Sequence, residues 1–354
     1  MQLDDRKKKI LHAIVDDYIE TAEPVASKAL VSRSDLHVKA ATIRNEMSDL
    51  EELGYLEKPH TSAGRIPSDK GYREYVNSLM QVHPLSPKEE QLIASRMEKS
   101  VEELTGLLRD ASETLAEQTG YTTIAVTPRL RKSYLTQLKM MMIEPGKVLV
   151  VVVLSAGIVK DRVVRVSDYI TQEQLIRISA AAEAGLCGKP LDEITLVAVT
   201  SAGKDMRLPD PIVNQILYEA YVAIKQADNI GVYIDGKHRI LNFPEFHDIH
   251  RVRSVFNTLD QDGIIAGYLR EQESPESAAS YMIRIGQEIT LEGLDGCSFI
   301  TTTYNTGDKL AGQIGVIGPK RMEYAKVIAN IGFIRTLIGK KLKSIEEENG
   351  GTYQ

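Results

Sequence analysis

The chain has 354 residues, of which 43% are hydrophobic, so it is long enough for two or three domains with ordinary cores. Its formal net charge of −6 excludes a protein that coats nucleic acid through a global positive field. Any contact with DNA must therefore come from a local basic patch.

The sequence predicts a cytoplasmic protein without a membrane partner. Residues 1–5 are not followed by the apolar core of a signal peptide, and the longest apolar run, 148–154, is too short to span a bilayer. The two cysteines, Cys187 and Cys297, lie far apart and indicate no disulfide framework, which is typical of a reducing compartment.

Two helices and a turn are predicted before residue 38. The first covers residues 5–20 and begins with four basic residues, 6–9. Positive charge opposes the helix dipole there, so this run is either solvated or in contact with phosphate. Its apolar residues make one core face: Ile10, Leu11, Ile14, Val15, Tyr18 and Ile19. A short second helix over 27–32 and a turn at 34–37 follow.

A third helix, over residues 40–53, has two different faces. Its apolar residues recur at steps of three and four and predict a buried stripe: Ala40, Ile43, Met47, Leu50 and Leu53. Four polar residues lie off this stripe and face outward: Thr42, Arg44, Asn45 and Ser48. Gly54 is the expected C-terminal stop.

A short strand at 55–58, a small basic loop at 59–65 and a second strand follow. This order of elements is typical of a winged helix-turn-helix, whose third helix enters the major groove while the loop reaches the DNA backbone or minor groove. Two plainer interpretations stay open: the outer face is simply solvated, or Arg44 makes an ion pair within its own domain.

The next segment is predicted to connect this domain to the rest of the chain. Ser68 or Asp69 caps a helix that should pack back on the first domain, and the prolines of 82–87 mark a linker. One long helix is expected over 86–118, with a heptad seam: Met97, Val101, Leu104, Leu108, Ala111 and Leu115. The seam packs either on the chain's own next domain or on a partner helix in a dimer.

Beyond residue 120 the pattern predicts an α+β domain. Strands are expected over residues 121–127, 133–143, 147–154, 157–166, 230–236, 296–303 and 310–317. Helices are expected over 171–185, 211–226, 246–272 and 321–342. The helical block up to 226 interrupts the sheet, because strand patterns resume only after it.

No enzyme, metal or cofactor is predicted. His247 and His250 have a spacing that suits one helix face, but no third ligand accompanies them, so a solvated helix start is favoured. The usual nucleotide-binding glycine motifs are absent between strand and helix, and Ser155 lacks the frame of a hydrolase nucleophile.

Two stretches closely resemble the HrcA family of bacterial heat-inducible transcription repressors. The first is T-I-R-N-E-M…L-E-x-x-G-Y with P-H-T-S-A-G-R-I-P-S-D-K-G-Y-R-x-Y-V, within residues 40–76. The second is G-x-I-G-V-I-G-P-K-R-M-x-Y, at 312–324. The resemblance extends over essentially the whole chain.

The resemblance implies a specific domain organisation. It comprises a winged-helix domain over 1–82, a linker helix over 83–120, a GAF-like domain over 121–169 and 227–342, a helical inserted dimerising domain over 170–226, and a tail over 343–354. It also implies a homodimer that represses chaperone operons at the CIRCE inverted repeat and is kept active by the GroE chaperonin. The alternative is an effector-controlled regulator that binds a small molecule in its GAF-like domain, and a third is a structural, chaperone-associated protein.

The expected DNA-binding residues lie on the third helix and in the loop. They are Lys39, Thr42, Arg44, Asn45, Ser48, His60, Thr61, Ser62 and Arg65. Arginine reads guanine and asparagine reads adenine by paired hydrogen bonds, so Arg44 and Asn45 are the expected base readers. Arg65 is expected to contact phosphate. The family commonly has Ser where Lys39 stands, so this helix is expected to lack its usual N-cap.

Overall fold

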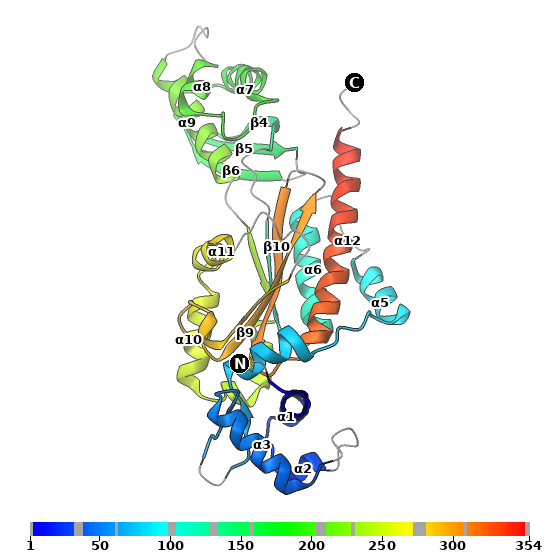
Figure 1. The fold of residues 1–354 in the computed structure, drawn as a ribbon. Helices are drawn as coiled ribbons and strands as arrows, with labels where there is room; N and C mark the ends of the chain where they lie inside the picture. The colour runs from blue at the N-terminus through cyan, green and yellow to red at the C-terminus, as the bar shows by residue number, and fades with distance from the viewer. Residues whose placement is uncertain are drawn as a thin grey trace.

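The computed structural model describes residues 3–31, 38–60, 63–97, 104–127, 133–155, 159–202, 210–227, 231–271, 281–306 and 310–350. These residues form an elongated molecule with three units (Figure 1). An N-terminal unit lies at one end, a five-stranded sheet with helices lies in the middle, and a smaller three-stranded sheet with its own helices lies at the other end.

The N-terminal unit has the predicted helices and hairpin in the predicted order. They are α1 (Asp5–Thr21), α2 (Ser27–Val31), α3 (Ala40–Glu52), β1 (Leu56–Glu57) and β2 (Ile66–Pro67). The Asp4 side chain caps α1 by accepting a hydrogen bond from the Lys7 amide. The three helices share a core that includes Ile10, Leu30 and Ile43, each fully buried. The predicted turn at 34–37 lies outside the described residues.

The chain leaves this unit through α4 (Asp69–Glu74) and a π-helical turn, η1 (Tyr75–Leu79). Ser68 is the N-cap of α4: its hydroxyl accepts from the Gly71 amide and donates to the Gly54 carbonyl at 2.6 Å. Gly71 lies so close to the hairpin that a Cβ there would meet the Tyr55 carbonyl at 2.2 Å. The start of α4 is therefore fixed to the N-terminal unit, as predicted.

The single helix predicted over 86–118 is wrong. The structure has two helices, α5 (Pro87–Met97) and α6 (Leu104–Thr119), which pack against each other, and Val101 lies outside the described residues. The seam residues of α6, such as Leu108 and Leu115, are buried against the chain's own α12 and β3. A single straight helix over 86–118 would span roughly 50 Å. In the structure, α5 folds back on α6 instead, and Ile93 and Met97 are buried.

The middle unit is built on a five-stranded antiparallel sheet in the order β7-β3-β10-β9-β8. The strands are β3 (Thr122–Val126), β7 (Val232–Asp235), β8 (Met282–Ile285), β9 (Cys297–Thr306) and β10 (Leu310–Pro319). Side chains alternate between the faces, so Ile124 joins one core and Ala125 the other.

Helices cover both faces of this sheet (Figure 1). One layer is α6 with α12 (Tyr324–Gly350), and the other is α10 (Ile249–Leu259) with α11 (Asp262–Glu271). Three 3₁₀ turns complete the unit: η2 (Lys237–Asn242), η3 (Pro244–Phe246) and η4 (Gly286–Glu288). The helix predicted over 246–272 is thus two helices. The tail predicted from 343 is wrong as far as 350, where the Lys- and Glu-rich sequence continues α12.

The third unit begins earlier than predicted. Its three-stranded antiparallel sheet is formed by β4 (Leu135–Glu144), β5 (Lys147–Leu154) and β6 (Val159–Arg165). These strands pack with α7 (Gln172–Leu186) and α9 (Asp210–Ala227), beside α8 (Leu196–Ser201). The boundary at 169/170 is therefore wrong, because among the described residues these strands form a sheet of their own that does not include β3. We call residues 133–227 the insert.

None of the described helices is both long and apolar enough to cross a membrane. Both cysteines are free thiols, Cys187 half-buried in the insert and Cys297 buried in β9. Burial raises the pKa of Cys297 to about 12, and burial also raises the pKa of Cys187.

We expect the two thiols to differ in reactivity, because the thiolate is the nucleophile and Cys297 is inaccessible. In the native protein at pH 8, iodoacetamide should modify Cys187 at least about ten times faster than Cys297. Peptide mass spectrometry measures both rates, and urea-unfolded protein is the control in which the rates converge. Equal rates in the native protein would contradict the buried position of Cys297.

Candidate nucleic-acid interface

The outer face of α3 lies at the end of the molecule opposite the insert (Figure 1). Arg44, Asn45 and Ser48 are exposed, and Thr42 is half-buried. The opposite stripe is closed: Ile43, Met47 and Leu50 have at most 4% of their surface exposed. The periodicity of the sequence therefore separated the two faces of this helix correctly. Its polar side chains face outward from a helix whose opposite face is packed into the core.

The acids of α3 are bound by cations from other elements. The Lys7 ammonium on α1 lies 2.7 Å from a Glu46 oxygen and 3.0 Å from an Asp49 oxygen. The bond to Glu46 is the main reason that the pKa of Lys7 is raised. Arg6 also lies 3.5 Å from Glu46. Two residues of the basic run at 6–9, Arg6 and Lys7, thus neutralise carboxylates of α3 from the side of α1.

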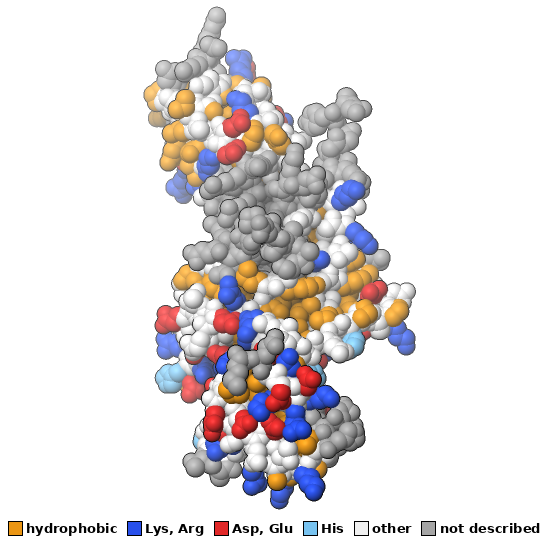
Figure 2. Space-filling model, in the orientation of Figure 1, with side chains coloured by type: hydrophobic (Ala, Val, Ile, Leu, Met, Phe, Trp, Pro, Cys, Tyr) orange, Lys and Arg blue, Asp and Glu red, His pale blue; other side chains and the backbone are white. Residues whose placement is uncertain are grey.

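Arg44 has no such partner in the described part of the chain. Among the described residues, no carboxylate lies within ion-pair distance of its guanidinium, so the alternative of an ion pair within the domain has no support there. The same holds for Lys8 and Lys9 on α1. Figure 2 shows blue basic side chains at this end of the molecule.

The N-terminus of α3 has no side-chain cap. Lys39 occupies the N-cap position in extended conformation and its exposed side chain makes no capping hydrogen bond. This confirms the expectation from its unusual residue type. The first amides of a helix carry partial positive charge, and together with the Lys39 ammonium they suit an anion.

The loop between β1 and β2 is attached to the segment just before α2. Val25 and Arg65 form an antiparallel bridge, with both N···O distances 2.8 Å. A Cβ on Gly64 would lie 2.4 Å from the Val25 carbonyl oxygen, so only glycine fits this approach. His60 is exposed on the same loop, whereas the predicted residues Thr61 and Ser62 lie outside the described residues.

Arg65 has a partner that the sequence did not reveal. Its side chain is only 14% exposed, and its guanidinium lies 2.6 Å from a Glu51 oxygen at the end of α3. This ion pair joins the loop to α3. A phosphate contact at Arg65 remains a prediction, and such a contact would have to share the guanidinium with Glu51.

The paired histidines His247 and His250 lie at the start of α10. The described residues contain no group of three or more side chains suited to a metal ion. Asp248, between His247 and His250, instead caps α10 by accepting from the amides of His250 and Arg251, which lower its pKa.

Comparison with known proteins identifies the family. The model of the HrcA protein C-terminal domain matches residues 105–328. The heat-inducible transcription repressor HrcA of Ruminiclostridium cellulolyticum is 40% identical over 343 residues, covering 97% of this chain and 98% of that protein. The protein of the same name from Acetivibrio thermocellus is 39% identical over 350 residues, covering 97% of this chain and 99% of that protein.

A crystal structure described as that of a hypothetical protein aligns over 97% of this chain and 100% of its own, with a TM-score of 0.64. At 21% identity it supports the fold alone. The sequence relatives are decisive: the chain belongs to the HrcA family of heat-inducible transcription repressors. The predicted family is confirmed, and the names of these relatives give no support to the effector-controlled alternative.

We expect the Glu51–Arg65 pair to hold the loop in place, because its loss leaves a largely buried guanidinium unpaired. Glu51→Ala should speed hydrogen exchange in peptides covering 54–68 about fivefold, equivalent to about 1 kcal/mol. Mass spectrometry measures the exchange. Glu52→Ala is the matched control, because it removes the carboxylate next to Glu51 on α3, and this carboxylate is exposed. Equal exchange in the two variants would show that the ion pair does not anchor the loop.

Proposed function

We propose that this protein represses heat-shock (chaperone) genes by binding an inverted-repeat operator as a homodimer, from the cytoplasm. The observation that carries the proposal is the outer face of α3, where Arg44 and Asn45 are exposed while the neighbouring carboxylates Glu46 and Asp49 are bound by Lys7. The family, whose members are named heat-inducible repressors, supports the same function.

In this proposal the N-terminal unit is a winged helix. Helix α3 lies in the major groove, where Arg44 bonds to guanine and Asn45 to adenine. Residues around Arg44 and Asn45 contact phosphate and sugar. These contacts fix the register of the protein on DNA without reading the base sequence. The residues proposed for these contacts are Lys39, Thr42, Ser48, His60, Thr61, Ser62 and Arg65.

The insert is proposed to join the two copies. One face of its sheet carries buried residues such as Val148 and Val150; α9 packs on β5 and β6, and α7 packs along β4. Arg162, opposite Val150, reaches Glu219 on α9, which places that helix on the same face. The other face carries six apolar side chains that are exposed or half-buried: Met141, Leu149, Val151, Val153, Val159 and Val163.

Such a face costs free energy when it is hydrated, and a second copy of the chain covers it by two-fold symmetry. The two N-terminal units then meet DNA as a symmetric pair, which requires an operator with inverted symmetry. The middle unit, a sheet between two helical layers, is proposed to be the GAF-like domain.

The resemblance to the family supplies the remaining identities. The operator is proposed to be the CIRCE element, and the partner that keeps the repressor active is proposed to be the GroE chaperonin. Heat would divert the chaperonin to unfolded proteins and so relieve repression. A gel shift with CIRCE-bearing DNA tests the operator directly, and adding purified chaperonin tests the partner.

The proposed role of Asn45 in base reading can be tested by substitution. Asn45→Ala removes an amide that can make two hydrogen bonds to adenine, worth about 1–3 kcal/mol of discrimination. Specific affinity should fall roughly 5- to 150-fold, while non-specific affinity barely changes because the phosphate contacts remain. Both affinities are measured by fluorescence anisotropy at one salt concentration.

Glu52→Ala is the control for this experiment, because it changes an exposed residue in the last turn of α3. Circular dichroism verifies that each variant is folded. If Asn45→Ala lowers specific and non-specific affinity equally, or lowers neither of them, Asn45 does not read a base.

The proposed dimer interface can also be tested by substitution. Val163 is 54% exposed on β6, and a charge at this position should not enter the monomer's core. Val163→Glu and Val151→Glu should each convert dimers to monomers, because an unpaired carboxylate would be buried between the copies. Sedimentation velocity measures the change.

Val197→Glu is the matched comparison, since Val197 is 73% exposed on α8. It should leave the dimer intact. Dimers that survive both sheet variants but are lost in Val197→Glu would place the interface on the helices of the insert instead.

A further inference from the structure

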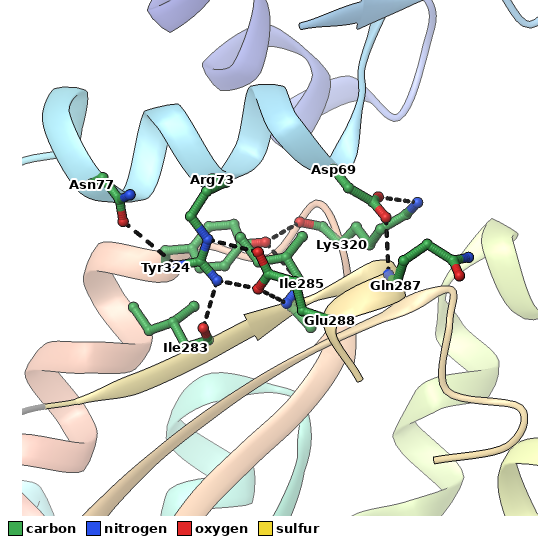
Figure 3. A network of polar contacts seen from close by, with 10 residues as sticks. Asp69, Arg73, Asn77, Ile283, Ile285, Gln287, Glu288, Lys320 and Tyr324 are labelled. Atoms are coloured by element: carbon green, nitrogen blue, oxygen red, sulfur yellow. Dashed lines mark hydrogen bonds and ion pairs between the residues drawn. The ribbon is translucent and has the colours of Figure 1, made fainter. Parts of the chain in front are cut away.

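The N-terminal unit is joined to the middle unit by polar contacts from one face of α4 (Figure 3). The Asp69 carboxylate binds the Lys320 ammonium at 2.6 Å and accepts a hydrogen bond from the Gln287 amide at 3.0 Å. One turn later, the Arg73 Nε donates to the Glu288 carboxylate at 2.9 Å. We call Asp69, Arg73, Glu288 and Lys320 the junction residues.

These contacts are directional and are supported by the neighbouring backbone. Arg73 also donates from Nη2 to the Ile283 carbonyl at 2.6 Å, and Glu288 accepts from the Ile285 amide at 3.0 Å. A Cβ on Gly286 would lie 2.0 Å from an Asp69 oxygen, so glycine alone admits the carboxylate here. The receiving surface, η4 and the end of β8, is therefore shaped around α4.

An aromatic contact lies beneath the polar one. Tyr72 and Tyr324 are each 1% exposed, with ring centroids 6.2 Å apart, and Tyr75 lies 6.4 Å from Tyr324. A second attachment lies at α1, where Arg321 donates to the Ile19 carbonyl at 3.1 Å and pairs with Glu245. The N-terminal unit is thus held in one orientation.

The junction does not cover the proposed DNA-binding face. The α3 helix lies toward the free end of the N-terminal unit, away from the middle unit (Figure 1), and Arg44, Asn45 and Ser48 are exposed. The contact therefore does not block α3 but fixes the direction in which α3 points. Without this contact, the tyrosine contact and the attachment at α1, orientation would depend on residues 80–86, which form neither helix nor strand.

Two linked binding units gain affinity only when their spacing and orientation match the two half-sites. We propose that the four junction residues are positioning residues for operator binding: they set the geometry of the paired α3 helices without touching DNA. The inference rests on the proposed function, since it requires a dimer and an inverted repeat. It adds the residues by which the chain selects the spacing between half-sites.

The test uses the full-length protein and three DNA duplexes. They are the CIRCE inverted repeat, the same repeat with its spacer lengthened by five base pairs (about half a helical turn), and a single half-site. The variants are Arg73→Glu, Glu288→Arg and the double exchange, with Arg177→Glu as the control. Arg177 pairs with Glu173 on α7 in the insert, remote from the junction.

Each single variant places like charges against each other at the junction. We expect it to weaken binding to the inverted repeat about tenfold or more, to leave half-site affinity within about twofold, and to reduce the penalty for the lengthened spacer. The double exchange should restore most of the affinity, because opposite charges face each other again. The control should bind all three duplexes as the unaltered protein does.

Other outcomes overturn the inference in distinguishable ways. If the unaltered protein binds the repeat no better than the half-site, the proposed function fails, and this inference fails with it. If the unaltered protein prefers the repeat but the single variants keep its affinity and spacer preference, the junction does not position α3. Equal losses on repeat and half-site, in variants that circular dichroism shows to be folded, would also overturn the inference, because the junction would then affect DNA contact by each unit and not the geometry of the pair.

Discussion

The proposed DNA-binding surface of this chain depends on how the carboxylates of α3 are neutralised. The protein carries a net charge of −6, and α3 itself contains more acids than bases. Lys7 binds Glu46 and Asp49 from behind, and Arg65 binds Glu51 at the end of the helix. These pairs leave Arg44 without an acidic partner in the described structure, so a local cationic surface can exist on an acidic protein.

The other two units fix the position of this surface. Three successive contacts define that place: the insert is proposed to join two copies, the five-stranded sheet links insert and N-terminal unit, and α4 attaches that unit to the sheet through Arg73 and Asp69. The described elements between α3 and the insert are packed into one another, so the proposed place of α3 is fixed relative to the insert.

Local sequence patterns predicted the helices and strands. Contacts between residues far apart in the sequence decide how these elements pack. The two faces of α3 and the helix cap at Ser68 follow from spacing and residue type. The Glu51–Arg65 pair does not, because no periodicity links residues in different elements. The heptad seam has the same spacing whether it packs on a partner or on the chain's own α12. Likewise, alternation in 135–165 identifies strands but not the sheet to which they belong.

The central claim is that two copies present α3 to two half-sites of one operator. Hydroxyl-radical footprinting on CIRCE-bearing DNA tests it most directly, because it maps backbone contacts nucleotide by nucleotide. We expect two equal protected patches, related by the two-fold axis of the repeat and lying on one side of the duplex, one helical turn or a multiple of it apart. A single protected patch, or protection that spreads evenly without reference to the repeat, would contradict it.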